Sequence, residues 1–386
     1  MRKPLISIVS TGAILFFYPT HSFATPSDGL VVKGSATISQ SGTSTLINQG
    51  SARAVIDWRG FDIGAGERVQ FIQANQQAIA LNRITGGNPT SILGQLAANG
   101  RVFISNPNGV IFGQGSKVDV AGLMTTTLSI NADDFMSGKN TLNQGITSSS
   151  SSVVNQGDIR IADNGFCFLV APSVQNSGTI IGQLGKVVLA SAESMTLDFN
   201  GDGLITYTVS GKALDNIIGA DGKPFASTVT NSGSIKNAGG EIVLVGNVES
   251  HNIFASVVNN SGLLEATSLV ANGGSVSLSG GDVGVVQNTG RIDVSATEAG
   301  AATGHVAISG QFAGNFGTIA ATGNTNANGG LVEFQSTTQT LLGSDSRINV
   351  SGKDNSSAGS VLIRSDNHSS FDGEVLARGG DNGGDG

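Results

Sequence analysis

One short phrase recurs along the chain and constrains the fold more than any other feature. It consists of an apolar residue, Asn, then Ser, Thr or Gln, then Gly, followed by a strand-like run. The copies are VNQGDIRI (154–161), VQNSGTII (174–181), VTNSGSIK (229–236), VNNSGLLE (258–265) and VQNTGRIDV (286–294), with a weaker GNFGTIAA (314–321). From 233 onward, the Gly recurs at intervals of 29, 28 and 27 residues. Such a period indicates a solenoid of stacked repeats.

A second phrase alternates with the first, as in GGEIVLVG (239–246), GGSVSLSG (273–280) and GHVAISG (304–310). Its period of two predicts short strands with one buried face. Asn and Gly suit the corners because both tolerate left-handed backbone conformations. Leucine-rich repeats are excluded by missing leucine periodicity, and propeller blades would be longer and richer in aromatic residues. The sequence therefore predicts an all-β protein, a parallel β-helix. Right-handed winding is preferred because no strict hexapeptide pattern occurs.

Two long intervals interrupt the repeats. The interval from Gly178 to Gly233 is 55 residues and contains an excursion near 197–229, which we expect to form hairpins on the side of the helix. A similar insert is expected at 133–152. The run DFNGDG (198–203) resembles the start of a calcium loop. However, Val209 stands where the bidentate Glu should be, so a hairpin turn is the favoured interpretation.

The N-terminus has the features of a secretory signal peptide. Arg2 and Lys3 precede an apolar run, and Ser22-Phe23-Ala24 offers a small-x-small cleavage site, so residues 1–24 are predicted to be removed on export. The chain carries a net charge of −8, which argues against a nucleic acid partner.

Few groups suit catalysis or metal binding. The single cysteine, Cys167, lies in an apolar run and is expected to be a buried hydrophobe. No Cys/His cluster has metal-ligand spacing, so no metal or other cofactor is predicted. Glycosidic cleavage needs paired carboxylates, whereas the acidic residues of the first third lie scattered over predicted turns: Asp57, Asp62, Glu67, Asp119, Asp133 and Asp134. We therefore do not expect an enzyme.

The first third of the chain contains one well-specified turn and the single tryptophan. In FISNPNGVIFGQG (103–115), the tetrapeptide Asn106-Pro107-Asn108-Gly109 fits a type I β-turn, and Pro107 stiffens this corner. Trp58 lies in AVIDWRGFDI (54–63). It is predicted to close the open end of the first coil, together with Phe61 and Phe71, and not to be an exposed aromatic for sugar contact.

Three segments, in order, resemble a known family: GSATISQ (34–40), AVIDWRGFDIGAGERVQF (54–71) and ALNRITGGNPTSILGQLAANGRVFISNPNGVIFGQGSKVDVAGLMTTT (80–127). They are similar to the N-terminal secretion (haemagglutination-activity) domain of two-partner secretion exoproteins of the filamentous haemagglutinin and high-molecular-weight adhesin type. The resemblance implies an N-terminal β cap, extra-helical hairpins, and export through the periplasm and an outer-membrane β-barrel partner with POTRA domains.

The resemblance also implies which residues form the secretion motif. The NPNG motif of the family falls on Asn106, Pro107, Asn108 and Gly109, while the second motif, NPNL, has no clear match. Residues 86–96 would form a loop and a short helix-like turn beside the NPNG motif. Residues 25–150 correspond to the conserved secretion domain, and 151–386 to continuing coils that end inside a repeat.

The functional prediction is thus a secreted, non-enzymatic exoprotein, part of a filamentous haemagglutinin-like adhesin at the cell surface or beyond. An alternative is an adhesin that binds host glycans or cell-surface receptors through this segment itself. A polysaccharide-degrading β-helix enzyme is the less favoured alternative. The sequence leaves open whether the partner reads the NPNG turn directly or needs it only for folding.

Overall fold

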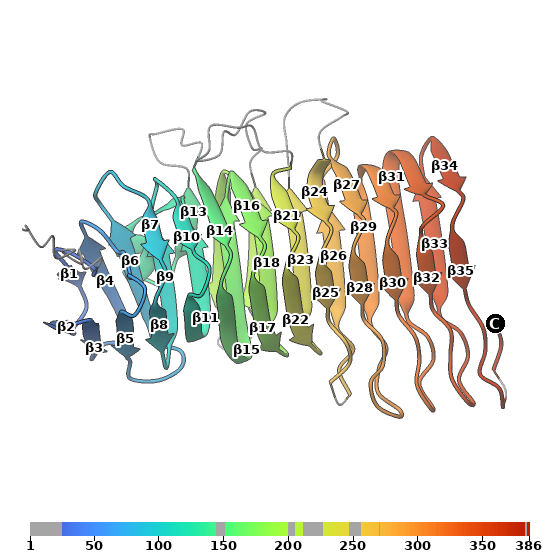
Figure 1. Ribbon diagram of the computed structural model, residues 1–386, viewed down its shortest axis with the longest axis horizontal. Helices are drawn as coiled ribbons and strands as arrows, with labels where there is room; N and C mark the ends of the chain where they lie inside the picture. The colour runs from blue at the N-terminus through green and yellow to red at the C-terminus, as the bar shows by residue number, and fades with distance from the viewer. Residues whose placement is uncertain are drawn as a thin grey trace, which may run out of the picture.

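The computed structural model describes residues 25–143, 151–199, 205–210, 227–246, 256–269, 271–382 and 384–386. These residues form a long rod, with the N-terminal coils at one end and the C-terminus at the other (Figure 1). The predicted signal peptide (1–24) lies outside the described residues. No helix in the described ranges is long and apolar enough to span a membrane.

The rod is a parallel β-helix whose coils pass through three stacks of strands in turn. The first stack contains β7 (Thr90–Ile92), β10 (Val110–Phe112), β14 (Ser152–Asn155), β16 (Ser173–Asn176), β21 (Val229–Asn231), β24 (Ser256–Asn260), β27 (Val285–Asn288) and β34 (His368–Phe371). The second contains β3 (Ser44–Gln49), β5 (Arg68–Ile72), β8 (Gln95–Ala98), β17 (Thr179–Gln183), β22 (Ser234–Ala238), β25 (Leu263–Glu265), β28 (Arg291–Asp293), β30 (Thr318–Ala320), β32 (Arg347–Asn349) and β35 (Glu374–Leu376). The third contains β4 (Arg53–Trp58), β6 (Ile79–Ile84), β9 (Arg101–Ser105), β18 (Lys186–Ser191), β23 (Glu241–Gly246), β26 (Ser275–Ser279) and β33 (Ser360–Ser365).

Four long strands turn a corner and serve two stacks. They are β11 (Lys117–Thr126), β15 (Asp158–Ala171), β29 (His305–Asn315) and β31 (Leu331–Leu342). Within each stack the alternate residues point inward, and one apolar core runs along the rod. The predicted parallel β-helix is confirmed, while its handedness stays a prediction.

The Asn of the recurring phrase forms a buried ladder. The side-chain amides of Asn155, Asn176, Asn231, Asn260, Asn288 and Asn315 stack coil on coil. Each Nδ2 except that of Asn315 donates to the Oδ1 of the next Asn at 2.7 Å. Every member is at most 1% exposed. A buried amide left without partners is costly, so the ladder explains why this position stays Asn from coil to coil.

Glycine is required at its position in the recurring phrase for a different reason from the one expected. Gly233, Gly262, Gly290 and Gly317 are not among the residues with positive φ, so the expectation of left-handed corners is wrong here. Instead, a Cβ at each of them would lie 2.1 Å from the carbonyl oxygen of the corresponding Gly one coil earlier. Only a residue without a side chain allows the coils to stack this closely.

An antiparallel cap closes the N-terminal end, as predicted. Strand β2 (Ala36–Ser41) pairs antiparallel with β3, and β1 (Leu30–Lys33) pairs antiparallel with β4. Strand β3 then continues as the first parallel member of the second stack, against β5. The cap therefore covers the strand edges that the first coil would otherwise expose.

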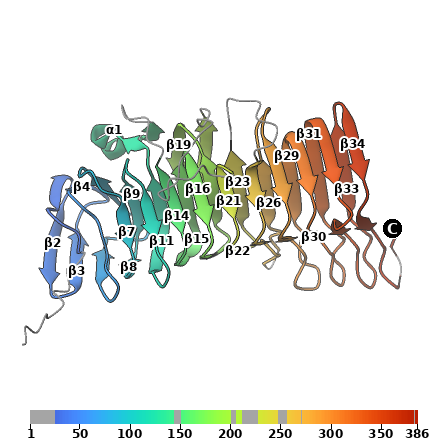
Figure 2. The ribbon, with the colours of Figure 1, turned by 45° about the horizontal axis from the view of Figure 1, so that its top comes forward.

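The two predicted excursions form one structure on the side of the rod, seen near α1 and β19 in Figure 2. Strands β12 (Ser129–Ile130), β13 (Asn140–Asn143), β19 (Ser194–Phe199) and β20 (Ile205–Ser210) make a four-stranded antiparallel sheet. The helix α1 (Ala132–Met136) accompanies it. Strands β19 and β20 pair as the predicted hairpin, and its turn at 200–204 lies outside the described residues.

This side sheet buries a second hydrophobic core. Phe103, Phe135, Phe166 and Phe168 are all fully buried there, although they lie outside the rod's own core. Arg101 stacks over the rings of Phe166 and Phe199, at 5.5 and 4.7 Å from their centroids.

The structure contradicts one local expectation, at residues 86–96, and agrees with another, at Cys167. The helix-like turn expected at 86–96 is wrong, because that segment contains the strands β7 and β8, which continue the stacks. Cys167 is fully buried in register between Leu123 and Val187, as expected of a small hydrophobe. Burial raises the pKa of its thiol.

Candidate functional site

The Asn106–Gly109 corner connects β9 to β10, which is the passage from the third stack to the first. The Gly109 N–H donates to the Asn106 carbonyl at 3.0 Å, closing the predicted turn. Gly109 has φ of 108°, a value that favours glycine. Both excursions of the side sheet leave the rod at this same edge, one and three coils further on.

Asn106 is the anchor of the corner, and its side chain is fully buried. Its Nδ2 donates to the Asn88 carbonyl and to Thr90 Oγ1, both at 3.0 Å, in the coil before. Its Oδ1 accepts from the Asn108 N–H at 2.9 Å, and its own N–H donates to the Thr126 carbonyl in the coil after. The Asn106 amide is therefore committed to internal partners in the folded state.

The rest of the corner lies nearer the surface. Pro107 and Asn108 are half-buried. The Asn108 Nδ2 donates to the Gly86 carbonyl at 2.9 Å, and the Gly109 carbonyl accepts from the Thr90 N–H at 3.0 Å. The corner thus rests on Gly86–Thr90, and the sequence interpretation missed this support because it assigned 86–96 to a helix-like turn.

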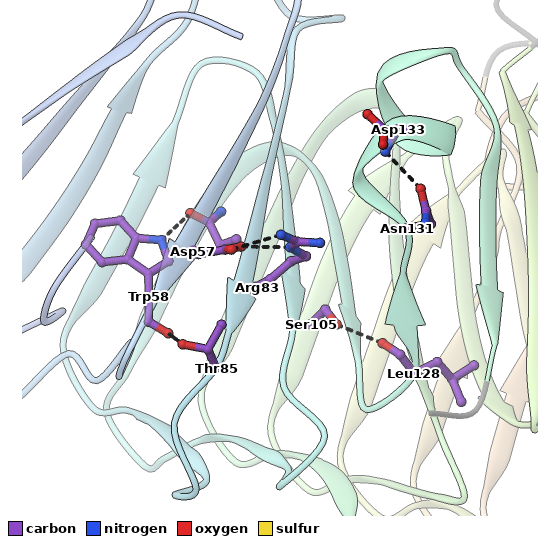
Figure 3. A network of polar contacts seen from close by, with 9 residues as sticks. Asp57, Trp58, Arg83, Thr85, Ser105, Leu128, Asn131 and Asp133 are labelled. Atoms are coloured by element: carbon purple, nitrogen blue, oxygen red, sulfur yellow. Dashed lines mark hydrogen bonds and ion pairs between the residues drawn. The ribbon is translucent and has the colours of Figure 1, made fainter. Parts of the chain in front are cut away.

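The predicted cap residues lie together at the start of the rod. Trp58, Phe61 and Phe71 are at most 1% exposed. The rings of Trp58 and Phe61 meet edge to face at 5.3 Å. The Trp58 Nε1 donates to Asn82 Oδ1 at 2.9 Å, and the Trp58 carbonyl accepts from Thr85 (Figure 3). Trp58 therefore fills the first coils and offers no face to a sugar.

Three of the scattered acidic residues have local structural partners in the first coils. Asp57 makes a two-pronged ion pair with Arg83 at 2.7 and 2.9 Å (Figure 3). Asp62 accepts from the Ser91 N–H, and buried Glu67 accepts from the Gly64 N–H, both at 2.7 Å. Among the described residues, no group of three or more His, Cys, Asp and Glu side chains could hold a metal ion.

Comparison with known proteins identifies the family. The model of the TPS secretion domain matches residues 22–294 of this chain. The chain therefore belongs to the TPS secretion domain family, which consists of exoproteins exported across the outer membrane by two-partner systems. The predicted resemblance is confirmed, and membership implies a TpsB transporter as partner.

Two curated relatives are both named Heme/hemopexin-binding protein and come from Haemophilus influenzae. One is 34% identical over 219 residues, which is 55% of this chain and 24% of that protein. The other is 48% identical over 103 residues, which is 26% of this chain and 11% of that protein. The chain thus aligns with about a quarter or less of each relative's length.

A solved structure agrees with the fold along nearly the whole chain. The crystal structure of the HMW1 secretion domain from Haemophilus influenzae superposes with a TM-score of 0.77 at 26% sequence identity. The match covers 92% of this chain and 91% of that chain. The rod is therefore the fold of a two-partner secretion domain.

Proposed function

We propose that the Asn106–Gly109 corner is the element that the transporter's POTRA domains read, and that they read it before the chain folds. Residues 25–150 would be the secretion domain proper, with cap and first coils, and residues 151–386 the continuing coils. The exported protein would be presented at the cell surface or released. It would not act as an enzyme, since the carboxylates of Asp57, Asp62 and Glu67 each have a separate local structural partner.

The burial of Asn106 carries this proposal. In the folded rod both atoms of its amide have internal partners, and only Pro107 and Asn108 are partly accessible. A partner that adds an extended segment to its sheet edge forms hydrogen bonds with its main chain and takes alternate side chains into pockets, so the segment must be free of other partners. Reading before folding thus makes all four residues available.

The test separates reading from folding. The chain is diluted from urea onto immobilised POTRA domains of its transporter, and binding is measured before refolding. The double variant Asn106→Ala/Asn108→Ala should lose at least tenfold in affinity. The control variant Asn260→Ala damages the folded ladder and should bind like wild type. Equal binding by the double variant and wild type would contradict direct reading and leave the corner a folding element only.

We also propose a second role, in which the exported coils themselves bind host ligands. The alternatives are glycans, as for an adhesin of the filamentous haemagglutinin type, and heme or hemopexin, because both curated relatives carry that name. A polar groove on the later coils favours glycans. Titrating the purified protein with oligosaccharides and with heme–hemopexin would discriminate, and binding of neither would contradict this second role.

A further inference from the structure

The later coils carry a groove on the outward face of the second stack. Its strands β28, β30 and β32 are three residues long, and the central residue of each points into the core: Ile292, Ile319 and Ile348. The flanking residues point outward. The groove has a volume of about 470 Å³, which lies within the range typical of small-molecule sites.

The register of the strands explains the groove. Thr318 lies between Arg291 and Arg347 in one row, and Ala320 lies between Asp293 and Asn349 in the next. Since neighbouring strands are ~4.8 Å apart, the two arginines stand about 10 Å apart across a floor of short side chains. Thr318 and Ala320 therefore create the groove by being small.

Each arginine is positioned by a carboxylate. Arg291 Nη2 lies 2.5 Å from Asp293 Oδ2, and Asp293 Oδ1 also accepts from the Ser295 N–H. Arg347 Nη1 pairs with Glu374 on the next strand. Arg291 and Arg347 remain 52% and 69% exposed. A guanidinium has five N–H donors, so one carboxylate partner leaves donors for a second anion.

The chemistry of the lining selects one class of ligand. The guanidinium groups of Arg291 and Arg347 line one edge of the groove. They suit a carboxylate, because a guanidinium binds a carboxylate through two parallel hydrogen bonds. Asn349 and the floor hydroxyls of Thr318 and Thr322 suit the hydroxyls of a sugar. A peptide cannot add as a strand here, because β30 is already paired on both sides. Asp293 and Glu374 would repel a polyphosphate of high charge density.

We propose that this groove binds an acidic saccharide, a uronate- or sialate-type sugar, with its carboxylate between Arg291 and Arg347. The proposal deepens the glycan-binding role and rests on it. Most of the groove's lining lies beyond residue 294, where the match to the secretion-domain model ends, while Arg291 and Asp293 lie just before it. The groove is thus a site on the later coils, far along the chain from the Asn106–Gly109 corner that we propose the transporter reads.

The test is calorimetric titration of the purified protein with sialylated and uronate oligosaccharides and with neutral analogues that lack the carboxylate. We expect binding of an acidic sugar that weakens with added salt. The double variant Arg291→Ala/Arg347→Ala should lose at least roughly tenfold in affinity, since each arginine supplies charged hydrogen bonds. Thr318→Leu, which fills the floor without adding charge, should lose binding as well.

A matched control removes the same charge elsewhere. The variant Arg68→Ala/Arg364→Ala changes arginines outside the groove and should bind like wild type, and circular dichroism checks that every variant keeps the β-helix. If acidic sugars bind but Arg291→Ala/Arg347→Ala has no effect, the assignment of the binding site to this groove is overturned, while the proposed glycan-binding role stands. If the neutral analogues bind equally well, the carboxylate assignment is overturned. If no saccharide binds, both proposals fail, without bearing on export.

Discussion

The first coils and the later coils of the rod share one path through the three stacks, but different contacts hold them together. Residues 25–126 depend on contacts that occur once, such as the antiparallel cap, the Trp58–Asn82 hydrogen bond and the Asp57–Arg83 pair. Residues 227–342 depend on contacts that recur in each coil, the Asn ladder and the glycine stack. A specific start thus sets the register for a regular array, whose stability is a sum of similar units.

The largest expected effect comes from breaking the specific start. Trp58→Ala removes a fully buried ring and should lower the free energy of unfolding by about 3–5 kcal/mol, measured by urea denaturation with circular dichroism. Hydrogen exchange should show lost protection in the first coils and retained protection after residue 256. Uniform loss along the rod would argue against two differently held regions.

The control for this variant is Trp58→Phe, which keeps a ring against Phe61 and loses the hydrogen bond to Asn82 and part of the ring volume. Its cost should be clearly smaller than that of Trp58→Ala. If both variants cost the same, the hydrogen bond and not the packing holds the cap.

The next effect comes from interrupting the array. Asn260→Ala leaves the Asn231 Nδ2 and the Asn288 Oδ1 without their ladder partners, each buried group costing about 1–3 kcal/mol. Its neighbour Asn259 is the control, because its Oδ1 has no hydrogen-bond partner within the described part of the chain. Asn259→Ala should therefore cost little in the same urea titration. Equal costs would mean that the ladder contributes no more than any other amide.

A smaller, local effect is expected at the side sheet. Arg53 Nη1 donates to the Phe135 carbonyl at 2.8 Å and to Asn140 Oδ1 at 2.9 Å, so it ties the first coils to the excursion. Arg53→Met should cost about 1–2 kcal/mol and speed proteolysis within 129–143. Lys139→Met, which removes only an exposed ion pair at 3.9 Å, is the control. Equal cleavage rates in the two variants would show that Arg53 is not the tie.

The smallest effect concerns Cys167. Burial raises the pKa of its thiol, so the folded protein keeps the proton at pH values where the unfolded chain loses it. Stability should therefore be unaffected below about pH 8.5 and fall slightly as the pH rises above it. Below that pH a thiol reagent should label the protein only after unfolding. Rapid labelling of the folded protein would contradict the burial of this side chain.

The repeats could be predicted because one short phrase both contains turn-forming residues and recurs at a regular interval. Asn231 and Gly233 mark a corner by local chemistry, and the same two residues recur as Asn260 and Gly262 one coil later. The regular recurrence of the phrase predicts that successive coils stack on one another. The true reason for the glycine, a carbonyl 2.1 Å from any Cβ, involves two coils and has no signal within one phrase.

The side sheet and the setting of the corner were harder to predict. The pairing of β13 with β19 joins segments more than fifty residues apart whose local patterns only indicate hairpins. Likewise, Asn106 is legible as a turn residue, but its partners Asn88 and Thr90 belong to the coil before. The Asn106–Gly109 turn is specified by its own four residues, whereas contacts between coils depend on register.

The Asn ladder also gives the rod an electrical polarity. From Asn155 to Asn315 every amide donates toward its C-terminal neighbour, every amide after Asn155 accepts from its N-terminal one, and the last Nδ2 donates to Ser346 Oγ at 2.6 Å. The small amide dipoles are therefore aligned along the axis. A chain that leaves a transporter with its N-terminus first would always present a donor at the growing face, and each arriving coil must supply an acceptor. An Asn or Ser at this position supplies that acceptor, so each added coil continues the row with the same polarity.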